Sequence, residues 1–259
     1  MSLETLLRRD RWLALAALGL LLLAAWGYVL SGAGMGMDAW DMTRMPSVFG
    51  LAPRPQAWSW GYALLMLAMW WSMMLAMMLP SAAPVLLLVA ALNRRAQPGR
   101  QPFGSCAGFV AGYLLAWGGF SLLAVLLQWL LMRQGLLTAM LGNTSRPLAG
   151  VILLVAGAWQ FSPLKHACLH HCQAPVQFLV QARQRGCGSL CSGARHGLYC
   201  LGCCWALMAL LFAGGVMNLY WIIGLTLYVM AEKLLPGDPW LSRLAGAGLL
   251  LGGLWLLAA

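Results

Sequence analysis

The cysteines of this chain are the residues whose type and spacing most clearly allow chemistry. Seven of the eight lie within residues 168–204, as two C-x3-C motifs followed by the segment CLGCC. On a helix, the C-x3-C spacing places both sulfur atoms on one face. In a reducing compartment such thiols bind metals or cycle between redox states more often than they form structural disulfides. The pattern therefore predicts thiolate chemistry.

Histidines accompany these thiols. His170 follows His166 by four residues, so the two imidazoles share a helix face if the segment is helical. His196, standing apart, is interpreted as a solvated residue at the membrane interface, and Cys106 as a small packing residue inside a span. The candidate metal ligands of this region are Cys168, His170, Cys172, Cys200, Cys203 and Cys204.

Methionines form a second group of soft atoms. Met66, Met69, Met73 and Met77 are spaced by three, four and four residues, and Met74 and Met78 form a parallel stripe beside them. Methionine often fills gaps in a helix bundle, so packing against the neighbouring tryptophans is one interpretation of the stripe. The other is metal binding, because thioethers and thiolates select Cu(I). The candidate ligands of the stripe are Met69, Met73, Met77 and Met78.

The Met-rich segment 31–57 precedes the stripe. It contains Met35, Met37, Met42 and Met45 together with two aspartates, although a loop rarely needs methionine for packing. Soft ligands then follow one another from this loop through the stripe to the thiols. This series favours Cu(I) as the bound metal, with zinc as the alternative.

Composition shows which elements must position these ligands. Of the 259 residues, 62% are hydrophobic and only 8% are charged, whereas about a quarter of the residues in a soluble domain are charged. We expect an all-α protein forming a polytopic transmembrane helical bundle, with residues 1–259 as a single integral membrane domain. The seven predicted spans are 12–30, 58–79, 105–131, 147–162, 198–215, 218–234 and 241–258.

Prolines and charges set the details of this arrangement. The second span continues as an apolar segment beyond Pro80 and Pro84, so we expect a bend or break there. Twelve of sixteen basic residues fall on one side if the N-terminus is cytoplasmic. We therefore expect a multi-pass protein of the bacterial inner membrane, with segment 31–57 outside and the Cys/His-rich segment 163–197 as a polar cytoplasmic loop. The net charge of +10 serves this orientation, not nucleic-acid binding.

Three motifs in order resemble a known family. They are WWSMMLAMMLP at residues 70–80, WQFSPLKHACLHHCQAP at 159–175, and the segment 199–235 that begins with YCLGCC. Together they resemble a family of bacterial integral membrane proteins of predicted metal-binding character, sometimes labelled copper chaperones. The resemblance implies a metal-binding character for the protein. The residues that match the family's motif positions are Met73, Met77, Met78, Pro80, Lys165, Cys168, Cys172, Cys200, Cys203, Cys204, Met217, Asn218, Glu232 and Lys233.

These features favour Cu(I) binding and transfer or transport through Met and Cys ligands. The protein would act within the lipid bilayer with a metallochaperone or a membrane complex as partner, and as a binding protein more than as an enzyme. The chain shows no Walker motif for nucleotide hydrolysis. One alternative is a membrane thiol oxidoreductase. Another is an assembly subunit with a structural zinc site. Glu232 and Lys233 are interpreted as an interfacial ion pair.

Overall fold

The computed structural model describes residues 3–44, 58–95, 106–137, 145–184, 187–235 and 240–258. Across these ranges the chain forms ten α-helices and one short 3₁₀ helix, with no strand. The all-α prediction is confirmed. Met45 and the rest of segment 45–57 lie outside the described residues.

The helices differ widely in length, and this decides which of them can cross a membrane. Their bounds are α1 Leu3–Leu30, η1 Gly32–Gly34, α2 Ala39–Arg44, α3 Trp60–Arg95, α4 Cys106–Arg133, α5 Arg146–Gln160, α6 Pro163–Gln173, α7 Pro175–Gln184, α8 Ser189–Gly214, α9 Leu219–Leu234 and α10 Trp240–Ala258.

Four of these helices, α3, α4, α8 and α10, are long and apolar enough to cross a membrane. A fifth crossing is formed if α5 and α6, which meet at a 64° bend, count as one broken span. The predicted number of seven spans is not confirmed. The 15 residues of α5 and the 16 of α9 are each short for a bilayer core about 30 Å thick, because a helix rises about 1.5 Å per residue.

Side-chain caps fix the helix starts near the bend. The Ser162 hydroxyl accepts a hydrogen bond from the Leu164 N–H, and Pro163 occupies the first turn of α6, where its missing N–H costs nothing. The Asn218 side chain caps α9 in the same way through the Tyr220 N–H. Between α8 and α9, Gly215 adopts a φ of +94°, which a residue with a side chain rarely accepts.

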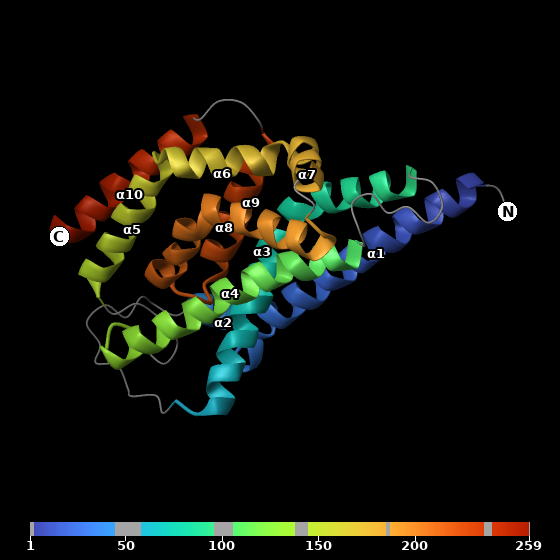
Figure 1. Cartoon of the computed structure of the whole chain (residues 1–259). Coiled ribbons are helices and arrows are strands. Elements are labelled where there is room, and N and C mark those ends of the chain that lie inside the picture. Colours follow the sequence, from blue (N-terminus) through green and yellow to red (C-terminus); the bar gives the residue numbers. More distant parts are fainter. Residues whose placement is uncertain are drawn as a thin grey trace.

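The proline pair in α3 bends the helix without ending it. Pro80 and Pro84 both lie inside Trp60–Arg95, which remains one helix, and Figure 1 shows α3 changing direction along its length. The predicted second span therefore extends past residue 79. The bend follows from the backbone hydrogen bonds that proline removes and from its clash with the preceding turn.

The sequence predicted that segment 163–197 is a polar loop, and this prediction is wrong. The segment folds into α6, α7 and the first turns of α8, so the fifth predicted span begins at Ser189 instead of residue 198. Helix α6 packs on α8 (Figure 1). The thiols of α6 are consequently brought against a candidate span instead of lying in a solvated loop.

The site is built where α3, α6, α8 and α9 meet, with α4 packed along α8 (Figure 1). Two glycines let α4 and α8 approach closely. A Cβ atom on Gly112 would lie 2.0 Å from the Leu190 carbonyl oxygen, and one on Gly193 would lie 1.9 Å from that of Phe109. Small residues permit such backbone contact between membrane helices, and here the contact fixes the direction in which α8 presents its cysteines.

Candidate metal centre

Lys233, in the last turn of α9, lies at the centre of the site. Its side chain is buried, and Nζ donates to Cys200 Sγ at 2.9 Å and to Ser81 Oγ at 3.1 Å. Met78 Sδ lies 4.0 Å away. Within the part of the chain that the structure describes, no carboxylate pairs with this ammonium group. A charge buried in an apolar interior requires a partner, and here the neighbouring groups are sulfur atoms and a hydroxyl.

Helix α8 supplies three buried thiols to this site. Cys200 and Cys204 are one turn apart, and the Cys204 thiol lies 3.9 Å from Met78 Sδ. The thiols of Cys203 and Cys204 both donate to the Cys200 carbonyl oxygen, at 3.0 and 2.9 Å. The Tyr113 hydroxyl, from α4, lies 3.4 Å from Cys200 Sγ.

Helix α6 adds two further thiols. The Cys172 side chain interacts with that of Cys203. The Cys168 sulfur lies against Gly202 of α8, so closely that a Cβ atom at this glycine would be 2.7 Å from it. Three helices thus bring together six sulfur atoms, which we call the sulfur cluster: those of Met78, Cys168, Cys172, Cys200, Cys203 and Cys204.

The chemistry of the sulfur cluster fits a soft monovalent metal ion. All its donor atoms are thiols or a thioether, which are the ligands that select Cu(I). Among the described residues, no three His, Cys, Asp or Glu side chains are already arranged as a metal site. Because the Cys203 and Cys204 thiols are hydrogen-bonded to backbone, they would have to rotate toward a metal ion when it binds.

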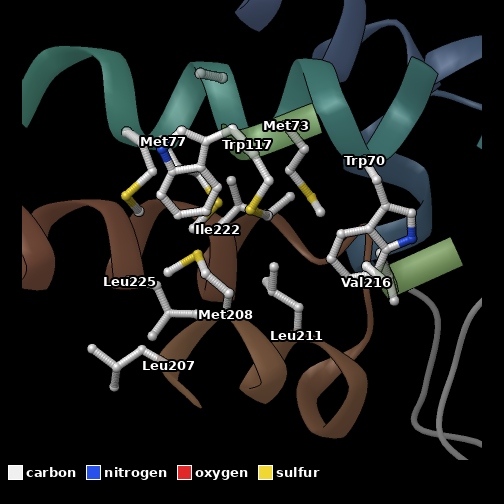
Figure 2. Packing of buried hydrophobic residues seen from close by; sticks show 14 of the residues in the cluster. Trp70, Met73, Met77, Trp117, Leu207, Met208, Leu211, Val216, Ile222 and Leu225 are labelled. Carbon is white, nitrogen blue, oxygen red and sulfur yellow. The ribbon is translucent and has the colours of Figure 1, made fainter. Parts of the chain in front are cut away.

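The methionine stripe is entirely buried. All six methionines between residues 66 and 78 have no exposed surface. Figure 2 shows Met73 and Met77 extending from α3 toward the side of the core occupied by Met208 of α8. Trp70 packs in the same core against Phe212, with ring centroids 5.0 Å apart. The stripe therefore does pack the core, and it also leads along α3 to Met78 of the sulfur cluster.

The histidines predicted beside the thiols do not join them. His170 is exposed, and His171 stacks on the Tyr199 ring at a centroid distance of 4.2 Å. His196, expected to be solvated, is instead buried against Phe109 and Phe178, because α8 begins earlier than predicted and carries this residue into the bundle. These positions leave the cluster with sulfur ligands.

Cys187 and Cys191 differ from the expected free thiols. They form a disulfide across the start of α8. Cys191 precedes Cys200 by nine residues of the same helix, a rise of about 14 Å. This pair is therefore separate from the sulfur cluster.

A second buried polar group lies on the other side of α9. Lys165 of α6 forms a salt bridge with Glu232 and donates a hydrogen bond to Gln160. The hydroxyls of Tyr228 and Ser242 also donate to the Glu232 carboxylate, each at 2.6 Å. We call these five residues the Lys165–Glu232 clasp, because they join α5, α6, α9 and α10.

The predicted ion pair between Glu232 and Lys233 is wrong. Consecutive residues on a helix do not face each other, so Glu232 enters the clasp while Lys233 enters the sulfur cluster. Sequence reasoning gave no partner for Lys165. The signal that marked all three charged residues is the family resemblance, because Lys165, Glu232 and Lys233 match its motif positions.

Removing only the Lys165 charge of the clasp should destabilise the protein more than removing the charges of both Lys165 and Glu232. Lys165→Met leaves Glu232 buried without its cation, and the free energy of unfolding in detergent micelles should fall by about 3–5 kcal/mol. Adding Glu232→Gln should restore part of this loss. As a matched control, Lys233→Met combined with Glu232→Gln should show no such rescue. A rescue by the second pair alone would contradict the assignment.

Comparison with known proteins agrees with this chemistry. The family model PpoB2, described as copper chaperone, matches residues 67–256, which is well over half of the chain and includes the sulfur cluster, the clasp and most of the methionine stripe. No curated protein and no solved structure matches the chain. The resemblance seen in the sequence is confirmed, and the chain belongs to the PpoB2 family of copper chaperones.

Proposed function

We propose that this protein binds Cu(I) at the sulfur cluster and transfers it through the bilayer region by exchange between thioether and thiolate ligands. The observation that carries the proposal is the convergence of six sulfur atoms from α3, α6 and α8, five of which lie around the buried Lys233. Copper is here the substrate that is carried.

Charge balance explains why a lysine belongs in such a site. Metals bind the thiolate form of cysteine, so capture of the ion releases protons. Cu(I) bound by two thiolates is a monoanion, which would be costly in an apolar bundle. The Lys233 ammonium, 2.9 Å from Cys200 Sγ, would neutralise it. The same ammonium would repel a bare cation, so copper is retained only as its thiolate complex.

The methionine stripe supports a path toward this site. Along α3, the distance from Met66 to Met78 is about 18 Å, more than half of the bilayer core. Beyond Met66 the soft atoms continue, since Met42 of α2 is buried and Met35 and Met37 pack against the same core. Thioethers need no deprotonation, which suits a path of low dielectric constant, and thiolates give the tighter final site.

Orientation in the bacterial inner membrane completes the proposal. The distribution of Lys and Arg favours a cytoplasmic N-terminus. The α2 end of the methionine path then faces outward, and the sulfur cluster lies toward the cytoplasm. A copper-binding protein or membrane complex would be the partner on either side.

The thiol oxidoreductase remains as a second candidate because of one observation. The Cys187–Cys191 pair is present as a disulfide, and Cys191 is exposed. A thiol–disulfide enzyme needs such an accessible pair. Its separation from the sulfur cluster along α8 favours two independent thiol systems over one redox chain.

Removing the buried thiols of Cys200 and Cys204 should abolish copper binding. Purified wild-type protein loaded with Cu(I) under reducing conditions should retain copper through gel filtration, measured by mass spectrometry of the metal. Cys200→Ser combined with Cys204→Ser should lose it, because serine oxygens are hard ligands. Cys106→Ser, away from the cluster, is the matched control and should retain copper. Zinc bound in place of copper by the wild type would favour the structural zinc alternative.

Replacing the methionine stripe should reduce copper transport more than it reduces the stability of the protein. Met69, Met73 and Met77 replaced together by leucine keep volume and apolarity, which costs less than about 1.5 kcal/mol per site. Proteoliposomes of this variant should accumulate far less copper, detected by an internal Cu(I) indicator, while the sulfur cluster still binds the ion in detergent. Normal accumulation with a normal melting profile would show that the stripe only packs.

Chemical labelling tests the orientation. A variant that keeps Cys191 as its single cysteine should resist a membrane-impermeant maleimide in intact cells and react after permeabilisation, because the start of α8 is expected to face the cytoplasm. The Cys191 side chain is exposed, so a maleimide that enters the cytoplasm can reach it. Labelling in intact cells would reverse the orientation and favour the oxidoreductase.

A further inference from the structure

The thiols of the sulfur cluster differ in burial, and we divide them into a deep part and an outer part. The inference rests on the proposed function. Cys200, Cys203 and Cys204 are at most 1% exposed, whereas Cys168 and Cys172 of α6 are only partly buried. Of these two, Cys168 is the more open.

Cys203 connects the two parts. It is a neighbour of the deep thiols on α8, and its side chain interacts with that of Cys172 on α6. A metal ion bound among the deep ligands therefore has a thiol of the outer part within reach, and the ion can move outward by exchanging one ligand at a time.

Gly202 brings the last ligand into contact. Because this residue has no side chain, the Cys168 sulfur approaches the backbone of α8 beside Cys203, and a Cβ atom here would be 2.7 Å from that sulfur. A larger residue would push the Cys168 thiol away from α8. The glycine thus sets the distance between the outermost thiol and the rest of the cluster.

The composition of α6 makes its surface accessible to a soluble partner. Its sequence PLKHACLHHCQ contains three histidines, which are costly in hydrocarbon and typical of a helix at the membrane–water interface. His170 and Ala167, on either side of Cys168, are exposed. A ligand arriving from water therefore reaches Cys168 before any other sulfur atom of the cluster.

Contacts at both ends hold α6 over the deep thiols. Lys165 joins the clasp near its N-terminus, and the Gln173 amide donates to the Glu232 carbonyl oxygen at 2.7 Å near its C-terminus. Cys168 lies between these two attachments. Its thiol is held on a fixed helix, and a ligand on a helix has a better-defined position than a ligand on a loop.

We infer that Cys168 is the exit ligand, which passes Cu(I) from the cluster to the thiol of a water-soluble acceptor. The acceptor thiolate forms a bond to copper while the bond between copper and Cys168 breaks. Copper stays in the +1 state, so no electron is transferred. The proton given up by the acceptor thiol is taken by the Cys168 thiolate that is released.

Transfer from the loaded protein to glutathione tests the inference. Cu(I)-loaded protein in detergent micelles is mixed with glutathione as the thiol acceptor, and the copper released is trapped by bathocuproine disulfonate and measured by its absorbance. Cys168→Ser should keep its bound copper but transfer it about tenfold more slowly, as expected for loss of a group that positions a metal. Cys106→Ser should match the wild type in both measurements.

Gly202→Ala tests the same step with every sulfur atom in place. The added methyl group displaces the Cys168 sulfur, which can rotate away without disturbing the backbone, so transfer should slow as in Cys168→Ser. Gly119→Ala on α4 is the matched control, since nothing lies within 4 Å of its added Cβ atom. Its transfer should remain at the wild-type rate.

The outcomes separate this inference from the proposed function. Unchanged transfer by Cys168→Ser would overturn the exit role while leaving copper binding intact. Loss of bound copper in that variant would also overturn it, because Cys168 would then be a holding ligand. A wild-type protein that binds no copper would refute the proposed function itself, and the exit role with it.

Discussion

The burial of the Lys233 ammonium constrains the rest of the structure. Removing an ammonium group from water costs several kcal/mol even after the protein relaxes, and this one lies among sulfur atoms and the Ser81 hydroxyl. The bundle must therefore supply negative charge at this position. A thiolate, or a thiolate complex of a monovalent metal, meets the need from the groups at hand. The cysteines of α8 can supply the negative charge that the buried Lys233 requires, and the lysine in turn stabilises their thiolate form.

Helix α9 couples this site to the rest of the bundle through two consecutive residues. Lys233 faces the sulfur cluster, and Glu232 faces the clasp with Lys165. Rotation of the end of α9 would move both. Because Lys165 is on α6, the helix that carries Cys168 and Cys172, the clasp fixes the outer thiols relative to the deep ones. Glu232 and Lys233 thus position the thiols that we propose as ligands.

The buried methionines pack the core and, under the proposed function, also serve as ligands. Their burial, with no exposed surface from Met66 to Met78, is what a structural core requires. A flexible thioether fills such a core as well as leucine does, and it also offers a soft donor atom. A path built in this way needs no water-filled channel, since an ion that exchanges ligands requires donors within reach and little more. Figure 2 shows methionine side chains from both helices in this core, Met73 and Met77 of α3 and Met208 of α8.

The sequence by itself determined the helical class and the membrane character and predicted soft-ligand chemistry, because these follow from composition and from spacing along one helix. The stripe from Met66 to Met77 needed only the period of an α-helix. Which thiols meet was decided by the tertiary structure, since the packing of α6 on α8 brings Cys172 to Cys203 and Cys168 to Gly202. The partners of Lys165 and Lys233 lie 67 and 33 residues away in the chain. A local pattern cannot identify such partners, because the energy of burying a charge depends on the groups that surround it in space.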